Sequence, residues 1–137
     1  MNKFPVGITI ENESTLSFGN YIVKEKIKVN DFEFKGNIYS LRSHNKVTRL
    51  EKNGELLLEA VPGAFIQNFY LDENLCSFNI EAPSSVQLTL GLLPAVNYNK
   101  IIKEDGTKIK VETSATGKLS FSVSLNDNTK KIDLEKI

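Results

Sequence analysis

Three residues of this sequence form the candidate set for nucleophilic chemistry. His44 is the only histidine, Cys76 is the only cysteine, and Ser43 directly precedes the histidine. A histidine can be the base that activates a serine or cysteine nucleophile, so these residues are the candidate catalytic set. Cys76 alternates with Phe78 and Ile80, however, which predicts a small core side chain. We therefore interpret His44 as a loop histidine, and one histidine with one cysteine predicts no zinc site.

Two pairs of neighbouring carboxylates, Asp72-Glu73 and Glu104-Asp105, are the next candidates. A glycosidase needs two carboxyl groups that face each other across a sugar, whereas neighbours on a tight turn point apart. Both pairs stand among turn-forming residues, so we interpret them as turn residues. Glu104 with His44 is then the only acid and base set that a glycoside hydrolase could use here.

Oxygen-rich and glycine-rich motifs add no cofactor site. Asn126-Asp127-Asn128 could ligate calcium, but the alternating acidic residues and the glycine of a calcium loop are missing. The sequence contains no glycine-rich phosphate loop and no nucleophile elbow. We expect no cofactor and no metal ion.

The composition limits the classes of partner. The 137 residues contain 17 Lys and Arg and 17 Asp and Glu, so the formal net charge is zero. A neutral chain has no net field that attracts nucleic acid or an anionic membrane, and weak mutual repulsion favours self-association. No apolar run is long enough to cross a membrane, and the N-terminus has no leader pattern. We expect synthesis in the cytoplasm, with a cell-surface or spore-surface location only after release.

The stretch of residues 118–125 is the clearest structural signal. Leu119, Phe121, Val123 and Leu125 alternate with three serines. Successive side chains of a strand point to opposite faces, so this pattern predicts a strand with one apolar face and one hydroxyl face. We expect the other elements to pack around this strand.

Short segments rich in Val, Ile, Phe, Tyr and Thr fill most of the remaining chain, and no segment predicts a helix. In one of them, Lys24, Lys26 and Lys28 share a face, which indicates a solvated edge strand, with polyanion binding as the alternative. The expected strands before the first long break include residues 6–11, 15–18, 21–29, 38–43, 47–52, 55–60, 65–71 and 75–82.

Asn53-Gly54 is the strongest turn signal. The pair supplies the two positive-φ residues of a type I′ turn, whose twist matches the flanking strands. A two-residue loop also sets the register of the hairpin. We expect Lys52 opposite Glu55, and Leu50 opposite Leu57.

Three further turns are expected. Gly36-Asn37 leads into residues 38–43, and Pro62-Gly63 fits the centre of a type II turn. Asp105-Gly106 predicts a second two-residue hairpin, which would place Ile102 opposite Ile109.

About eleven or twelve short strands with short connections predict an all-β fold, an antiparallel β-sandwich of immunoglobulin-like or jelly-roll-like type. The length fits one domain over residues 1–137, with a candidate sub-boundary at residues 83–85. The run 90–98 resembles the tyrosine corner of fibronectin type III and other immunoglobulin-like sandwiches. The resemblance implies that the Tyr98 hydroxyl bonds to backbone upstream of it.

Several turns and strands resemble one known family. The block Val-Thr-Arg-Leu-Glu-Lys-Asn-Gly at 47–54, with 59–63 and 87–92, resembles small proteins of clostridia and related anaerobic Firmicutes that are often labelled endosialidase. The resemblance covers nearly the whole chain and carries no catalytic signature. Sialidases resemble one another in an arginine cluster and in Asp-box repeats that contain tryptophan. This chain has only Arg42 and Arg49 and no tryptophan, so no catalytic residue is carried over.

Three functions are consistent with these observations. The leading hypothesis is a non-catalytic structural protein that assembles with copies of itself, as a homo-oligomer, lattice or filament, through strand edges. The alternative is a glycan-binding module whose aromatic residues stack on sugar rings, with Tyr39, Phe69 and Tyr70 as candidates. An endosialidase-like glycoside hydrolase is the third hypothesis.

Overall fold

The structure is a computed structural model that describes residues 7–11 and 13–137. These residues form thirteen β-strands and one short 3-10 turn, η1 (Lys103–Asp105), and none of them lies in an α-helix. The strands are β1 (Ile8–Glu11), β2 (Thr15–Phe18), β3 (Ile27–Phe34), β4 (Asn37–His44), β5 (Val47–Lys52), β6 (Glu55–Val61), β7 (Phe65–Leu71), β8 (Leu75–Glu81), β9 (Ser85–Gly91), β10 (Asn97–Ile102), β11 (Thr107–Glu112), β12 (Lys118–Ser124) and β13 (Thr129–Lys136).

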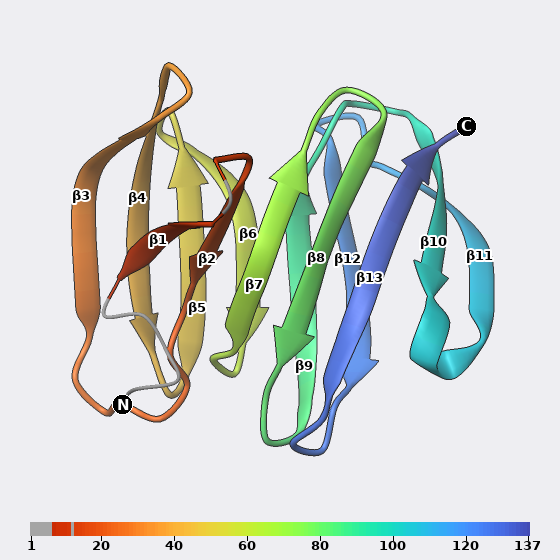
Figure 1. The fold of residues 1–137 in the computed structure, drawn as a ribbon. Helices are drawn as coiled ribbons and strands as arrows, with labels where there is room; N and C mark the ends of the chain where they lie inside the picture. Colours follow the sequence, from red (N-terminus) through yellow and green to blue (C-terminus); the bar gives the residue numbers. More distant parts are fainter. Residues whose placement is uncertain (1–6, 12) are drawn as a thin grey trace.

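The strands build two sheets that lie face to face (Figure 1). The seven-stranded sheet has the order β1-β2-β7-β8-β13-β10-β11, and the six-stranded sheet has the order β12-β9-β6-β5-β4-β3. Every neighbouring pair is antiparallel. The predicted antiparallel β-sandwich is therefore confirmed, and each sheet takes strands from both sides of Pro83.

One apolar core fills the space between the sheets. From the seven-stranded sheet, Phe18, Phe69 and Phe78 meet ring to ring, with centroids 6.0 Å and 5.6 Å apart. Leu50 and Leu88 approach from the six-stranded sheet, and both are fully buried. Each such side chain contributes about 1.5–3 kcal/mol through removal from water, so the core is what holds the two sheets together.

The alternation in residues 118–125 is confirmed, but its expected place in the fold is wrong. Leu119 and Val123 are buried, and the serines between them are exposed. β12 nevertheless lies at the edge of the six-stranded sheet and not at its centre. The alternation of apolar and polar residues indicates which face of a strand is buried. An edge strand has one buried face just as a central strand does, so the pattern does not distinguish them.

The segment 21–29 is a strand only from Ile27 onward. The chain leaves β2 in one sheet and enters β3 in the other, so residues 19–26 must cross between the sheets. The Tyr21 hydroxyl donates a hydrogen bond of 2.8 Å to Glu81 Oε2 at the end of β8. Of the lysine row, only Lys28 lies on a strand, and that strand is an edge of its sheet.

The hairpin at Asn53-Gly54 forms, and one of its two expected pairs is shifted. Asn53 and Gly54 have φ of 51° and 83°, and Lys52 pairs with Glu55. Leu50 pairs with Leu58 and not with Leu57, because the register shifts between Leu50 and Glu51. The bulge turns an additional leucine of β6 inward, which the alternation rule alone cannot anticipate.

Two other turns differ from their expected types. Gly63 does not have a positive φ, so Pro62-Gly63 is not a type II turn; the Val61–Pro62 peptide is cis. Glycine is required at residue 63 because a Cβ there would collide with the carbonyl oxygen of His44. The first hairpin of the six-stranded sheet turns at Lys35-Gly36, one residue earlier than expected.

The Asp105-Gly106 hairpin is longer than two residues. Ile102 pairs with Thr107 and not with Ile109, because residues 103–106 form the 3-10 turn η1 and its left-handed cap. The carboxylates of Glu104 and Asp105 in this turn bond to Lys131 and Lys130 of the neighbouring strand β13.

A buried hydroxyl cluster ties β4 and β5 to the segment that enters β7. The Thr48 hydroxyl donates to the Ala64 carbonyl oxygen (3.0 Å), accepts from the Ala64 N–H (3.2 Å) and lies 2.9 Å from the Ser43 hydroxyl. The Ser43 hydroxyl in turn accepts a hydrogen bond of 2.8 Å from the N–H of Asn20. Backbone groups of two inter-sheet connections are thus satisfied by side chains.

We expect Thr48→Val to lower the free energy of unfolding by about 1–3 kcal/mol, because an isosteric methyl group leaves the buried Ala64 N–H and C=O without this partner. Thr89→Val is the matched control, since the Thr89 hydroxyl bonds to Ser120 on the exposed face of the same sheet. Its expected loss is within about 0.5 kcal/mol. Urea unfolding of both variants measures the difference, and equal losses would contradict the role given to Thr48.

Candidate functional site

The structure does not bring the candidate nucleophiles to the histidine. Ser43 and His44 are neighbours on β4, so their side chains point to opposite faces of the six-stranded sheet. The Ser43 side chain is fully buried in the hydroxyl cluster. Cys76 is fully buried on β8 in the other sheet, where burial raises the pKa of its thiol. These three residues therefore form no nucleophile and base pair.

The carboxylates of the 3-10 turn bond to the neighbouring strand. Glu104 Oε1 accepts a hydrogen bond of 3.0 Å from the backbone N–H of Lys131. Asp105 Oδ1 lies 2.6 Å from Lys130 Nζ. Both groups join the turn to β13, and neither is near His44, which lies at the end of β4 in the other sheet.

The glycan candidates do not form an exposed aromatic platform. Tyr39 and Phe69 are 7% and 4% exposed and belong to the core, so they cannot stack on a sugar ring. Tyr70 is half-buried, and its hydroxyl donates a 2.6 Å hydrogen bond to Asp72. The hydrogen bond from Tyr70 is the main cause that lowers the pKa of the Asp72 carboxyl. Among residues 7–11 and 13–137, every aromatic side chain is buried or half-buried.

Tyr98 is buried at the start of β10, directly after the chain has crossed from the six-stranded to the seven-stranded sheet. Burial raises the pKa of its phenol, and a hydrogen bond with the backbone of Leu93 acts in the opposite direction. This contact lies five positions upstream in the connection itself, so the tyrosine fastens the corner to the strand that follows it.

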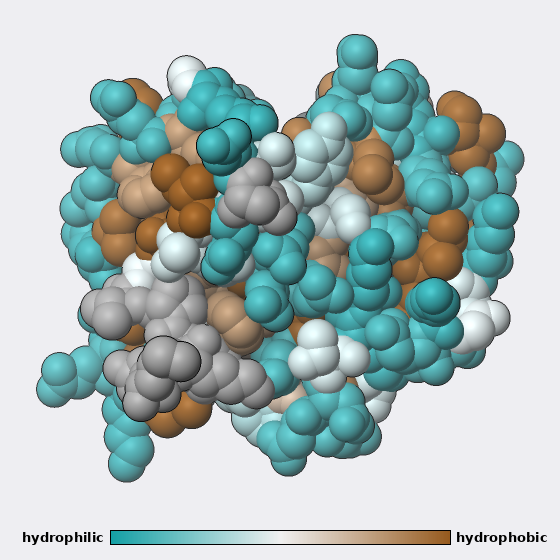
Figure 2. Space-filling view, in the orientation of Figure 1, coloured by the Kyte–Doolittle hydropathy of each residue, from teal (hydrophilic) through white to brown (hydrophobic). Residues whose placement is uncertain are grey.

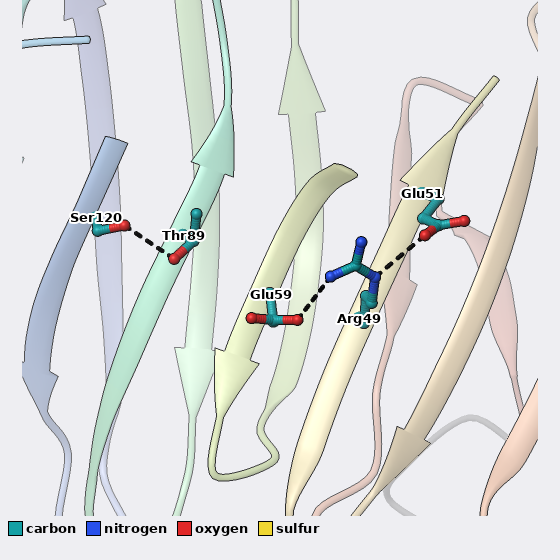
Figure 3. Close-up of polar contacts among 5 residues, drawn as sticks. All are labelled: Arg49, Glu51, Glu59, Thr89 and Ser120. Atoms are coloured by element: carbon teal, nitrogen blue, oxygen red, sulfur yellow. Dashed lines mark hydrogen bonds and ion pairs between the residues drawn. The ribbon is translucent and has the colours of Figure 1, made fainter. Parts of the chain in front are cut away.

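The outer face of the six-stranded sheet carries a row of polar side chains (Figure 3). Arg49 binds two carboxylates, Glu51 Oε2 at 3.1 Å and Glu59 Oε2 at 2.8 Å. Farther along, the hydroxyls of Thr89 and Ser120 are 2.9 Å apart. The row crosses all six strands through the cross-strand partners Lys28, Arg42, Arg49, Glu59, Thr89 and Ser120. Both arginines lie in it, and the Arg49 charge is neutralised within the row.

A cleft of about 500 Å³ opens at one end of the sandwich, where the β5–β6 and β7–β8 turns meet the β9–β10 connection. Leucine side chains line its apolar part, among them Leu57, Leu71 and Leu92. Charges of both signs line the rest: Lys52, Glu55, Asp72, Glu73 and Lys118. Because the lining contains both positive and negative side chains, the cleft favours neither anionic nor cationic ligands.

Three of the four edge strands carry a feature that limits pairing with another chain, at one point or along the whole strand. β1 is only four residues long. β3 is interrupted by a register shift between Val29 and Phe32, with Asp31 at a φ of 54°, and the runs 27–29 and 32–34 on either side of the shift are regular. The exposed side chains of β11 include Lys108 and Lys110. Short length, bulges and charges are the devices by which sheet proteins protect their edges.

The fourth edge, β12, is neither short nor bulged, and it carries a single charged residue. It pairs with β9 through seven consecutive residues without a register shift. Lys118, at its beginning, is its only charged residue, and its three serines are exposed. One hydrogen-bonding side of β12 faces β9, and the other side has no strand beside it among the described residues. Such a regular edge is a template for a further strand.

Apolar side chains beside this edge are only partly covered. Lys100 Nζ of β10 lies 4.5 Å from the centroid of the Phe121 ring, so β10 faces β12 across the core. β11 continues beyond β10, past the last strand of the six-stranded sheet (Figure 1). On β11, Ile109 is the partner of Lys100 and shares its inner face, yet it is 48% exposed. Val111 and Phe121 are half-buried.

We call β12 together with Ile109 and Val111 the β12 edge site. In Figure 2 the visible face of the molecule is mostly hydrophilic, and apolar patches lie on the left, over the β1–β4 side, as well as at the right-hand margin. The edge site combines a strand that has no neighbouring strand on one side among the described residues with the exposed Ile109 and the half-buried Val111.

Comparison of the chain with protein-family models, curated proteins and solved structures gives no match. The resemblance to the proteins labelled endosialidase therefore stays a prediction. The edge site, the polar row and the end cleft are the features of the structure that bear on function.

Two further properties of the described residues also concern function. They contain no helix with the length and apolar content that crossing a bilayer requires. They also bring no three His, Cys, Asp or Glu side chains together as a set of metal ligands.

Proposed function

We propose that this protein is a non-catalytic structural protein that assembles with copies of itself through the β12 edge site. The observation that carries the proposal is that the one unprotected edge strand adjoins the exposed Ile109 and the half-buried Val111 and Phe121. A strand that pairs with β12 would satisfy its open backbone groups and cover these side chains together.

The neutral composition supports the same function. Equal numbers of acidic and basic residues leave little long-range repulsion between copies. An interface built from backbone hydrogen bonds, serines and apolar side chains contains few ion pairs, so assembly should depend weakly on salt. Such a protein would act through its shape and its contacts, as a subunit of a lattice or filament.

The first test places a charge on the inner side of the edge strand. Phe121→Glu puts a carboxylate beside Lys100, where it can form an ion pair within the monomer, while an added strand would have to bury it. Inward-pointing charges are a known protection of edge strands. Burying a charge costs several kcal/mol, so we expect association to weaken by about 100-fold, the equivalent of about 3 kcal/mol.

Ser120→Glu is the matched control. It adds the same charge to the same strand, but the side chain points to solvent on the outer face. Light scattering coupled to gel filtration, at low and high salt, should detect large species for the parent protein and for Ser120→Glu, and monomer for Phe121→Glu. Circular dichroism verifies that both variants are folded. A parent protein that stays monomeric at high concentration would refute the proposed function.

A further inference from the structure

The two ends of the sandwich are offset in opposite directions. At one end β11 extends beyond β12, so the seven-stranded sheet overhangs. At the other end, among the described residues, β3 is the outermost strand and β1 lies inside it, so the six-stranded sheet overhangs (Figure 1). No described strand of the six-stranded sheet lies beneath β11, and β3 projects from that sheet at the opposite end of the molecule.

The direction of the strands fits this arrangement. The five steps from β3 to β12 through the six-stranded sheet are all antiparallel, so β3 and β12 run in opposite directions. When a second copy has the same orientation as the first, its β3 lies antiparallel to β12. The two six-stranded sheets then continue as one antiparallel sheet.

The side chains of the two ends are also complementary. The inner side of β3 carries an apolar stripe, and all four of its members, Ile27, Val29, Phe32 and Phe34, are only half-buried. Beneath β11 this stripe would meet Ile109, which is exposed, and Val111, which is half-buried. On the outer side, Lys28 and Glu33 of β3 would lie beside the uncharged serines of β12, so no like charges would face each other.

A symmetric pair of β12 strands is disfavoured by the same offset. A two-fold axis perpendicular to the sheet would bring β11 of the partner over β12, where β10 already lies against Phe121. Each overhanging β11 would then occupy the space of the other copy's β10. A head-to-tail contact avoids this collision because the overhangs belong to different sheets.

We propose that β3 of a second copy of this chain pairs antiparallel with β12 beneath the overhanging β11, and that repetition of this contact gives an open, polar filament. The proposal rests on the proposed function and names its interface. A contact between two different surfaces leaves a free β3 edge at one end and a free β12 edge at the other, so growth continues unless the rotation between copies closes a ring.

Cross-linking between two single variants tests the pairing. Ser122→Cys marks the middle of β12 and Lys28→Cys marks β3, and both side chains point to the outer face. The native Cys76 is fully buried and leaves the added thiol as the accessible one. The two variants are mixed, allowed to assemble and treated with a short bis-maleimide reagent, which tolerates some variation in register.

We expect a cross-linked dimer that contains one molecule of each variant, and little cross-linking of either variant alone. Lys108→Cys on β11 is the control, since its side chain lies on the outer face of the other sheet. Large species whose Ser122→Cys subunits cross-link only to each other would overturn the head-to-tail contact and leave self-assembly standing. Large species with no mixed cross-link would overturn it too, whereas a strict monomer would refute the proposed function itself.

Discussion

Gly117→Ala is expected to lower the free energy of unfolding by about 2–4 kcal/mol, because two separate costs add at this residue. Gly117 has a φ of 84°, in the left-handed region where a Cβ is unfavourable. A Cβ at this position would also collide with the carbonyl oxygen of Leu92. The backbone cannot simply move away, since the N–H of Leu92 donates a 2.7 Å hydrogen bond to the Gly117 carbonyl oxygen.

Gly54→Ala is the matched control for the first of these costs. Gly54 has nearly the same φ, 83°, and no atom lies within 4 Å of the position that a Cβ would take. We expect this variant to lose about 1 kcal/mol, from the left-handed conformation alone. Urea unfolding of both proteins separates the conformational cost from the collision. If the two variants lose equal amounts, the close approach of Leu92 makes no contribution.

The sequence predicted the type of the elements better than their arrangement. Alternation in residues 118–125 and the Asn53-Gly54 signal are local properties, and both elements form where they were expected. The sheet to which a strand belongs depends on contacts between distant segments. For this reason β12 was expected at the centre of the fold and lies at an edge.

The errors in register have a similar origin. The bulge between Leu50 and Glu51, and the 3-10 turn at 103–105, each insert residues that a two-residue turn rule does not count. The segment 21–26 has the composition of a strand, yet it has to cross between sheets. In each case the requirements of the sandwich override a local preference.

The candidate site shows what a single sequence can and cannot supply. Strand edges were expected to mediate assembly, but nothing local distinguishes an edge strand from a central one. β12 became a candidate only after the topology placed it beside the overhanging β11. One local hint of the edge site was present in the sequence. Ile109 is an apolar residue that stands between two charged residues, Lys108 and Lys110.

The second large loss of stability is expected for a substitution at the centre of the core. Phe78→Ala should lower the free energy of unfolding by about 3–5 kcal/mol, since the cavity left by a buried phenyl ring adds to the lost transfer energy. Phe78 is 1% exposed, stacks on Phe69 and lies on β8 opposite Ile132 of β13. Neighbouring strands on both sides fix the backbone, so the site cannot collapse to fill the space.

Phe34→Ala is the control, because Phe34 is a half-buried ring at the end of edge strand β3. Burial of roughly half the ring predicts a loss of about 1–2 kcal/mol. Both substitutions are best measured by urea unfolding in the Phe121→Glu background, where self-association cannot add to the apparent stability. A typical domain is stable by only about 5–15 kcal/mol, so Phe78→Ala should bring the protein close to unfolding at 37 °C. A larger loss for Phe34→Ala than for Phe78→Ala would mean that the main stability of the sandwich lies at its β3 end and not between β8 and β13.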